Sequence, residues 1–247
     1  MQSEFRRAIA GKKAALDALR PLGPNELAQV RKYYDIELTY SSNAIEGNQL
    51  TARETAEVIE HGVTVAGKRL RDHLEALDHY EAVQWVHELA DQATPLDETV
   101  VTELHRRIVA RSQPAIAGVY STLPRRIVGS AVVFPNPAKL PELMRDFGKW
   151  LEAVEVGYES AFEAHLTLVS IHPFSDGNGR VARLLMNLIL LRAGYPLVSV
   201  RLEDRSFYLD TIEKAQLTGE DASYRSFMLQ RLDATLADYL EALGRQP

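Results

Sequence analysis

The chain contains no cysteine and no long uninterrupted run of apolar residues. The lack of cysteine excludes disulfide bonds and thiol catalysis, and it fits a protein that works in a reducing cytoplasm. The apolar runs are too short to cross a membrane, and the basic residues near the N-terminus are not followed by the apolar stretch of a signal peptide. We therefore expect a cytoplasmic protein that does not insert into a membrane.

The chain also has fewer basic than acidic residues. The 28 lysine and arginine residues are outnumbered by 34 acidic residues, which gives a formal net charge of −6. Proteins that bind the phosphate backbone of nucleic acids carry a basic face, so we expect neither DNA nor RNA as a partner. Apolar residues make up 46% of the 247 residues, which is ordinary for a folded protein of this length.

The spacing of apolar residues predicts a mainly α-helical fold, a compact helical bundle. A capping box from Thr51 to Glu54 marks the start of one helix, and Gly62 marks its end. His105 and His165 fall within predicted helices, where we expect them to be core or capping residues rather than catalytic ones. Helices are predicted at residues 24–44, 51–62, 70–90, 97–111, 159–171 and 184–191, the last of them apolar enough to be buried.

One segment departs from the helical pattern. Residues 118–122 and 126–134 are rich in β-branched and aromatic side chains, with glycines between them, and a Pro-Asn-Pro sequence follows. This composition predicts a small β-hairpin. A capping hairpin over the core and a functional covering segment are both compatible with it.

The most informative stretch runs from Ile171 to Arg183 and ends in the predicted buried helix. Helix N-termini attract anions, and glycines allow a turn to form a concave nest for phosphate oxygens. Arginine forks match phosphate groups, and Asp176 supplies the oxygen ligand that Mg²⁺ prefers. His172 can accept a proton near neutral pH. The stretch therefore predicts chemistry on a phosphate ester, although it does not fix which phosphorus atom is attacked.

The pattern His-Pro-Phe-x-Asp-Gly-Asn-Gly-Arg-x-x-Arg, complete from His172 to Arg183, resembles the signature of the Fic (Fido) family. The resemblance implies a Fic-type helical bundle that transfers AMP from ATP to a Ser, Thr or Tyr hydroxyl of a target protein. It implies that His172 is the catalytic base and that Asp176 holds Mg²⁺ on the α- and β-phosphates. The implied phosphate-binding residues are Gly177, Asn178, Gly179, Arg180 and Arg183.

A second segment, with Ser42, Glu46 and Gly47, resembles the inhibitory motif of the same family, Ser/Thr-x-x-x-Glu-Gly/Asn. The resemblance implies that Glu46 pairs with Arg183 in place of the γ-phosphate, so that ATP binds in an unproductive pose. Because both motifs lie in one chain, we expect intramolecular inhibition through an N-terminal helix. The sequence leaves open whether Glu46 also supports the removal of AMP from a modified target.

The resemblance identifies the predicted hairpin as the flap, which covers the active site and holds an extended target chain by strand addition. Tyr208 either contacts the adenine or ribose or belongs to the core, and the sequence does not decide between these alternatives. The residues expected to dock the target are Ile127, Val128, Gly129, Ser130, Ala131 and Val132.

These assignments divide the chain into two parts that we expect to form one compact unit. Residues 1–93 form an N-terminal helical region with the inhibitory motif, and residues 94–247 form the catalytic core with the flap and C-terminal helices. The expected partners are ATP and an unidentified target protein, and a homodimer is expected only by analogy. Two alternatives stay open: a Fic-fold transferase with another phosphate-containing donor, including phosphorylation, and a non-catalytic nucleotide-binding module.

Overall fold

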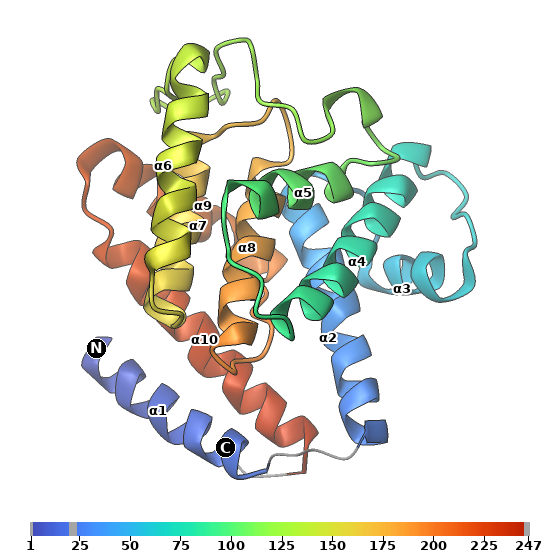
Figure 1. Ribbon diagram of the computed structural model, residues 1–247. Helices are drawn as coiled ribbons and strands as arrows, with labels where there is room; N and C mark the ends of the chain where they lie inside the picture. The colour runs from blue at the N-terminus through green and yellow to red at the C-terminus, as the bar shows by residue number, and fades with distance from the viewer. Residues whose placement is uncertain (1, 20–23, 245–247) are drawn as a thin grey trace.

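A computed structural model describes residues 2–19 and 24–244, which form ten α-helices joined by loops (Figure 1). The mainly helical fold predicted from the apolar periodicity is confirmed. The helices are α1 (Gln2–Ala18), α2 (Pro24–Ile45), α3 (Ala52–His61), α4 (Leu70–Ala90), α5 (Glu98–Ile108), α6 (Leu140–Ala153), α7 (Tyr158–Ile171), α8 (Asn178–Arg192), α9 (Arg205–Thr218) and α10 (Ala222–Ala242), with short 3-10 helices η1 (Pro114–Ile116), η2 (Pro137–Lys139) and η3 (Leu202–Asp204).

Helix α8 lies at the centre of the molecule, and its sequence explains this position. It is apolar on nearly every face, and almost all of its residues are buried. A helix of this kind is stable only when other helices enclose it. Helices α2, α4, α5 and α7 pack around α8 (Figure 1). The loop that precedes α8 is thereby held close to these helices.

Helices α1 and α10 lie side by side at one edge of the molecule (Figure 1). The Lys12 ammonium contacts the Asp233 carboxylate over 2.9 Å, and Ile9 of α1 is fully buried. One hydrophobic cluster extends from Ile9 to Leu240, so side chains from both sides of residue 93 share a core. The boundary at residue 93 stays a prediction. Within the described ranges, every helix is too short or too polar to span a lipid bilayer.

Local signals in the sequence set several helix ends. Thr51 and Gly62 cap α3 at its two ends, and Gly62 adopts φ +64° there, a left-handed conformation that glycine tolerates. The prediction for residues 70–90 coincides with α4, whereas α5 ends at Ile108, before the predicted end at residue 111. Helices α1 and α6 were not predicted from the sequence.

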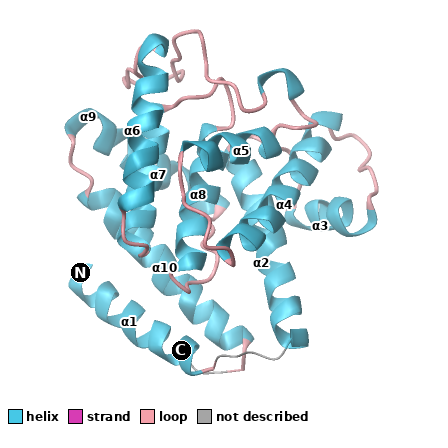
Figure 2. Ribbon diagram, in the orientation of Figure 1, coloured by secondary structure: helices cyan, strands magenta, loops and turns pink. Residues whose placement is uncertain are grey.

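The predicted β-hairpin is wrong. Figure 2 shows residues 121–136 as loop, and Tyr120 forms an isolated antiparallel bridge with Phe174 instead of starting a strand pair. The backbone N–H of Ala131 donates to the Glu213 carboxylate over 3.2 Å, so a side chain satisfies a group that a second strand would have paired. Pro124 removes a further donor from the segment. The flap is therefore an irregular loop tied to the rest of the protein.

Replacing Thr51 by alanine should destabilise the fold through loss of the α3 cap. The Thr51 hydroxyl accepts a hydrogen bond from the Glu54 N–H over 3.2 Å, and the Glu54 carboxylate accepts one from the Thr51 N–H over 2.7 Å. We expect Thr51→Ala to lower the free energy of unfolding in urea by about 1 kcal/mol. Thr51→Ser keeps the hydroxyl and serves as the control; equal losses in both variants would contradict this assignment.

Candidate active site

His172 lies at the junction between α7 and the loop that precedes α8. Its backbone has φ +53° and ψ +54°, and no other non-glycine residue in the described ranges has a positive φ. Non-glycine residues rarely adopt this left-handed conformation, and such strain persists where the surrounding structure enforces it. The ring of His172 stacks on Phe134 of the flap, with centroids 4.0 Å apart. The flap and the loop therefore fix the orientation of the imidazole together.

The imidazole of His172 lines a cavity of about 300 Å³. Its Nδ1 lies 3.4 Å from the carbonyl oxygen of Val169, so we assign the ring proton to Nδ1 and the lone pair to Nε2. Burial lowers the pKa of His172, and the ring is consequently neutral at pH 7. A neutral imidazole at the cavity wall can accept a proton from a hydroxyl group.

The side chain of Asn178 stabilises the loop that precedes α8. Its side-chain oxygen accepts a hydrogen bond from the Phe174 N–H over 2.9 Å, and its amide group donates to the Phe174 carbonyl over 2.8 Å. The Asn178 side chain is buried, so both bonds are shielded from water. The contact of Asn178 with phosphate oxygens that the resemblance implies stays a prediction.

His105 of α5 supports the same loop from outside. Its ring stacks on Phe174 with centroids 3.7 Å apart, and its Nδ1 accepts a hydrogen bond from the Gly118 N–H over 3.0 Å. Its Nε2 therefore carries the proton and donates to the carbonyl of Asp176 over 3.1 Å. Burial lowers the pKa of His105 to about 4, which keeps this pattern intact at neutral pH. His165 is also fully buried, as expected of a core residue.

Glu46, just beyond the end of α2, is in contact with Arg183 of α8. The two side chains form an ion pair of 2.7 Å, and Arg183 also donates to the hydroxyl and the carbonyl of Ser42, each over 2.9 Å. Arg183 is 2% exposed. Burial works against its charge, but the carboxylate of Glu46 is close enough to raise the pKa of Arg183. The structure thus brings the two predicted motifs together.

Gly179 explains how the Glu46 carboxylate fits against α8. A Cβ atom at Gly179 would overlap the Glu46 Oε1 atom. Gly47 completes the arrangement, because its φ of +94° turns the chain directly after Glu46. The first turn of α8 and Arg183 form an anion-binding position, which Glu46 occupies.

Arg180 is almost completely buried, with 1% exposed, yet it is poorly paired. Its nearest acidic partners, Glu75 and Asp176, lie 3.6 Å away, and its Nε has no hydrogen-bond partner among the described residues. Buried polar groups are normally hydrogen-bonded, and a buried charge needs close compensation. The guanidinium therefore has donors to offer to an anionic ligand.

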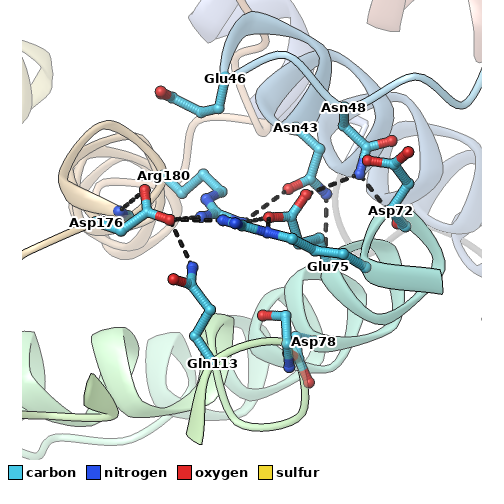
Figure 3. A network of polar contacts seen from close by, with 12 residues as sticks. Asn43, Glu46, Asn48, Asp72, Glu75, Asp78, Gln113, Asp176 and Arg180 are labelled. Carbon is cyan, nitrogen blue, oxygen red and sulfur yellow. Dashed lines mark hydrogen bonds and ion pairs between the residues drawn. The ribbon is translucent and has the colours of Figure 1, made fainter. Parts of the chain in front are cut away.

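Asp176 belongs to a polar network that extends toward α4 (Figure 3). Its Oδ2 accepts from Arg71 over 2.8 Å and from Gln113 over 2.5 Å, and its Oδ1 accepts from the Gly177 N–H over 2.7 Å. Burial opposes ionisation, but Arg180 and these hydrogen bonds hold the pKa of Asp176 below its usual value. No group of three or more metal-ligating side chains occurs in the described ranges. A single carboxylate suits Mg²⁺ that is also bound by substrate phosphates.

Several parts of the chain line the cavity beside His172. Glu46, Gly179 and Arg183 come from the two predicted motifs, and α9 contributes residues between Tyr208 and Gln216. The flap contributes Ile127, Val128, Gly129, Ser130 and Phe134. Of the two other residues expected to dock the target, Ala131 is tied to Glu213 through its backbone and Val132 is buried, and neither lines the cavity.

Tyr208 also lines the cavity, but its side chain belongs to the core. It is 1% exposed, and its hydroxyl group lies 2.7 Å from Nε2 of His165. Burial raises the pKa of Tyr208. A ring enclosed in this way has no free face for an adenine base, which favours the core alternative over stacking.

Sequence reasoning did not identify four polar residues of the site: Arg71, Glu75, Gln113 and Glu213. Arg71 and Glu75 have the i, i+4 spacing of an ordinary surface ion pair, which gives no functional signal. Gln113 lies in the turn after α5, and Glu213 lies on α9. Their relation to the loop exists only after the helices have packed.

Comparison with known proteins agrees with the geometry. The family model described as "Fic/DOC family" matches residues 95–190, and the chain belongs to this family. A curated relative from Nematostella vectensis, "Protein adenylyltransferase Fic", is 35% identical over 92% of this chain. The match covers 54% of that relative, so the chain spans about half its length.

Two solved structures are similar to the whole described fold. A Fic domain containing signaling protein from Bacteroides thetaiotaomicron has a TM-score of 0.89 and 28% identity, covering 97% of this chain and 98% of that one. Fic-1 from C. elegans has a TM-score of 0.84 and 28% identity, covering 97% of this chain and 71% of that one. These likenesses confirm the Fic-type fold expected from the sequence.

Replacing Asn178 by alanine should loosen the loop before α8. The variant loses two buried hydrogen bonds to Phe174, so we expect the free energy of unfolding in urea to fall by about 2 kcal/mol. In Asn178→Asp the Phe174 N–H keeps an acceptor, but the second carboxylate oxygen faces the Phe174 carbonyl, so we expect this variant to be destabilised as well. A stability of Asn178→Ala equal to that of the unmodified protein would contradict the bracing role.

Proposed function

We propose that this chain is an ATP-dependent protein AMP transferase whose activity is restrained by its own Glu46. The observation that supports this most is the shared cavity: His172, Gly179 and Arg183 line it, and Glu46 occupies the anion-binding position within it. The name of the curated relative, a protein adenylyltransferase, agrees with this reaction. The alternative donors and the phosphorylation reaction are separate outcomes of the test below.

In the proposed reaction, the oxygen of a target hydroxyl forms a bond to the α-phosphorus of ATP. The bond between that phosphorus and the bridging oxygen of pyrophosphate breaks, and pyrophosphate leaves with the electron pair. The hydroxyl proton passes to Nε2 of His172, which is neutral and therefore able to accept it. The product is a phosphodiester between AMP and the target side chain.

The remaining groups of the site bind the triphosphate in this proposal. Arg180 offers a buried guanidinium whose Nε has no hydrogen-bond partner in the described part of the chain, and the first turn of α8 offers backbone N–H groups. Asp176 would hold Mg²⁺, which would supply neutralisation of the phosphate charge. The flap residues Ile127 to Ser130 also line this cavity, and in this proposal they contact an extended target chain there.

The restraint follows from competition for Arg183. Its Nε and Nη2 groups already donate to Ser42 and Glu46, so the end of a triphosphate cannot take these same donors at the same time. Fixing the triphosphate decides which phosphorus faces His172. The target protein, a cytoplasmic location, a homodimer and a role of Glu46 in removing AMP stay predictions.

Replacing Glu46 by glycine should relieve the proposed inhibition and raise the activity of the enzyme. Freeing Arg183 removes a competitor for the triphosphate, and we expect self-labelling with ATP to rise by about tenfold or more, since tenfold corresponds to roughly 1.4 kcal/mol. The measurement is incubation with ATP and Mg²⁺, with radioactive phosphorus at the α or the γ position in parallel. Glu220→Gly removes an exposed acid outside the cavity and is the matched control.

The position of the label discriminates between the candidate functions. Label transferred from the α position supports AMP transfer, and label transferred only from the γ position supports phosphorylation. No label from either position in Glu46→Gly would favour the non-catalytic nucleotide-binding module. Equal labelling of Glu46→Gly and of the protein without substitutions would contradict the proposed inhibitory role of Glu46.

Replacing His172 by alanine should abolish transfer and leave nucleotide affinity intact. The base acts on the target hydroxyl, so in the Glu46→Gly background we expect a loss of about 10²- to 10⁴-fold in rate. ATP affinity, measured by isothermal titration calorimetry, should change by less than about twofold, because other groups bind the phosphates. His61→Ala, at an exposed histidine on α3, is the control. A large loss of ATP affinity would contradict the role of His172 as base.

A further inference from the structure

The carboxylate proposed to hold Mg²⁺ is already engaged by the chain itself. Both Arg71 of α4 and Gln113, in the turn after α5, donate to the same oxygen of Asp176, over 2.8 and 2.5 Å. The Arg71 guanidinium carries a full positive charge, and its side chain is 48% exposed. A divalent cation at this oxygen would face a positive charge at hydrogen-bonding distance.

Glu75 holds Arg71 in this position. The Nε of Arg71 donates to Glu75 Oε1 over 2.8 Å, while a different nitrogen, Nη2, reaches Asp176. The guanidinium therefore bridges two carboxylates on different elements, and its fork is fixed in orientation. Glu75 has little freedom to release it, because the Glu75 side chain is itself buried.

The same network reaches the turn that follows Glu46. Asn48 donates to Glu75 Oε2 over 3.1 Å and to the carbonyl of Asp72 over 3.0 Å. From α2, Asn43 donates to the carbonyl of Glu75 over 3.3 Å. Figure 3 shows the side chains of Asn43 and Asn48 directed toward α4, whereas Glu46 between them points away from this network. The segment that bears Glu46 and the residue that holds Arg71 are thus joined by hydrogen bonds.

Resting on the proposed function, we propose that Arg71 is a second restraint on this site, one that competes with the divalent cation for Asp176. Glu46 blocks Arg183, at the position of the phosphate tail, and Arg71 blocks the metal ligand; the two restraints act on different groups. Full activity requires both to be displaced. Glu75 is the positioning residue, since it orients Arg71 and connects it to the α2–α3 turn.

The test measures metal binding directly rather than turnover. The dissociation constant for Mn²⁺, in the presence of the nonhydrolysable analogue AMPPNP, is determined by electron paramagnetic resonance for the unmodified protein and for Arg71→Ala. We expect Arg71→Ala to bind Mn²⁺ about fivefold more tightly, the scale of one partly exposed ion pair. In the Glu46→Gly background the shift should be of the same size, because Glu46 contacts Arg183 and not Asp176.

Two further variants keep the result interpretable. Arg71→Gln removes the charge and retains a donor for Glu75, so it should also tighten Mn²⁺ binding, by a smaller factor. Arg201→Ala is the matched control. The Arg201 side chain is 43% exposed and forms a 3.0 Å ion pair with Asp238, and neither residue lines the cavity beside His172. This variant should leave Mn²⁺ binding unchanged. Urea denaturation of each variant verifies that the fold is intact.

Unchanged Mn²⁺ binding in both Arg71 variants would overturn the proposal. Weaker binding of Mn²⁺ and of AMPPNP would overturn it as well, because Arg71 would then be a ligand of the phosphates. Either result is independent of the labelling experiment with Glu46→Gly. Failure of AMP transfer there, together with tighter Mn²⁺ binding in Arg71→Ala, would reject the proposed reaction and leave the metal competition standing.

Discussion

The ion pair between Glu46 and the buried Arg183 is the interaction on which the arrangement of this site depends. A guanidinium that is 2% exposed requires a nearby negative charge, and the N-terminal end of α8 adds further positive potential at the same place. In this structure the chain supplies that negative charge from the residue that follows α2. The contact that we propose to be inhibitory is therefore also the contact that compensates the positive charge at this anion-binding position.

The same principle extends across the loop before α8. Arg180 lies between Glu75 and Asp176, and Asp176 lies between Arg180 and Arg71. Positive and negative groups alternate. In our proposals, a nucleotide with its cation replaces Glu46, just beyond α2, and Arg71 of α4. Substrate binding is thus an exchange of ionic partners rather than entry into a pocket with uncompensated charges. The free energy needed to break the existing ion pairs depends on helices that do not touch the reacting atoms.

Local patterns predicted most of the helices that build this frame, because capping boxes, terminal glycines and apolar spacing act over a few residues. The capping box at Thr51 and the span of α4 are examples. The same reasoning failed for residues 118–134, whose β-branched composition suggested a hairpin. A strand needs a partner, and here Tyr120 pairs with Phe174 while Glu213 takes the N–H of Ala131. Tertiary contacts overrode the local preference.

The sequence by itself determined the chemistry available at the loop from His172 to Arg183, since residue types and their spacing fix which groups can accept protons or bind phosphate. It also supplied, through the motif around Glu46, the partner expected for Arg183. Only the tertiary structure decided that Arg71 reaches Asp176, because these residues lie on different elements and α4 must pack beside the loop before they meet. Spacing along a helix constrains neighbours in sequence, whereas contacts between distant segments depend on how the whole core packs.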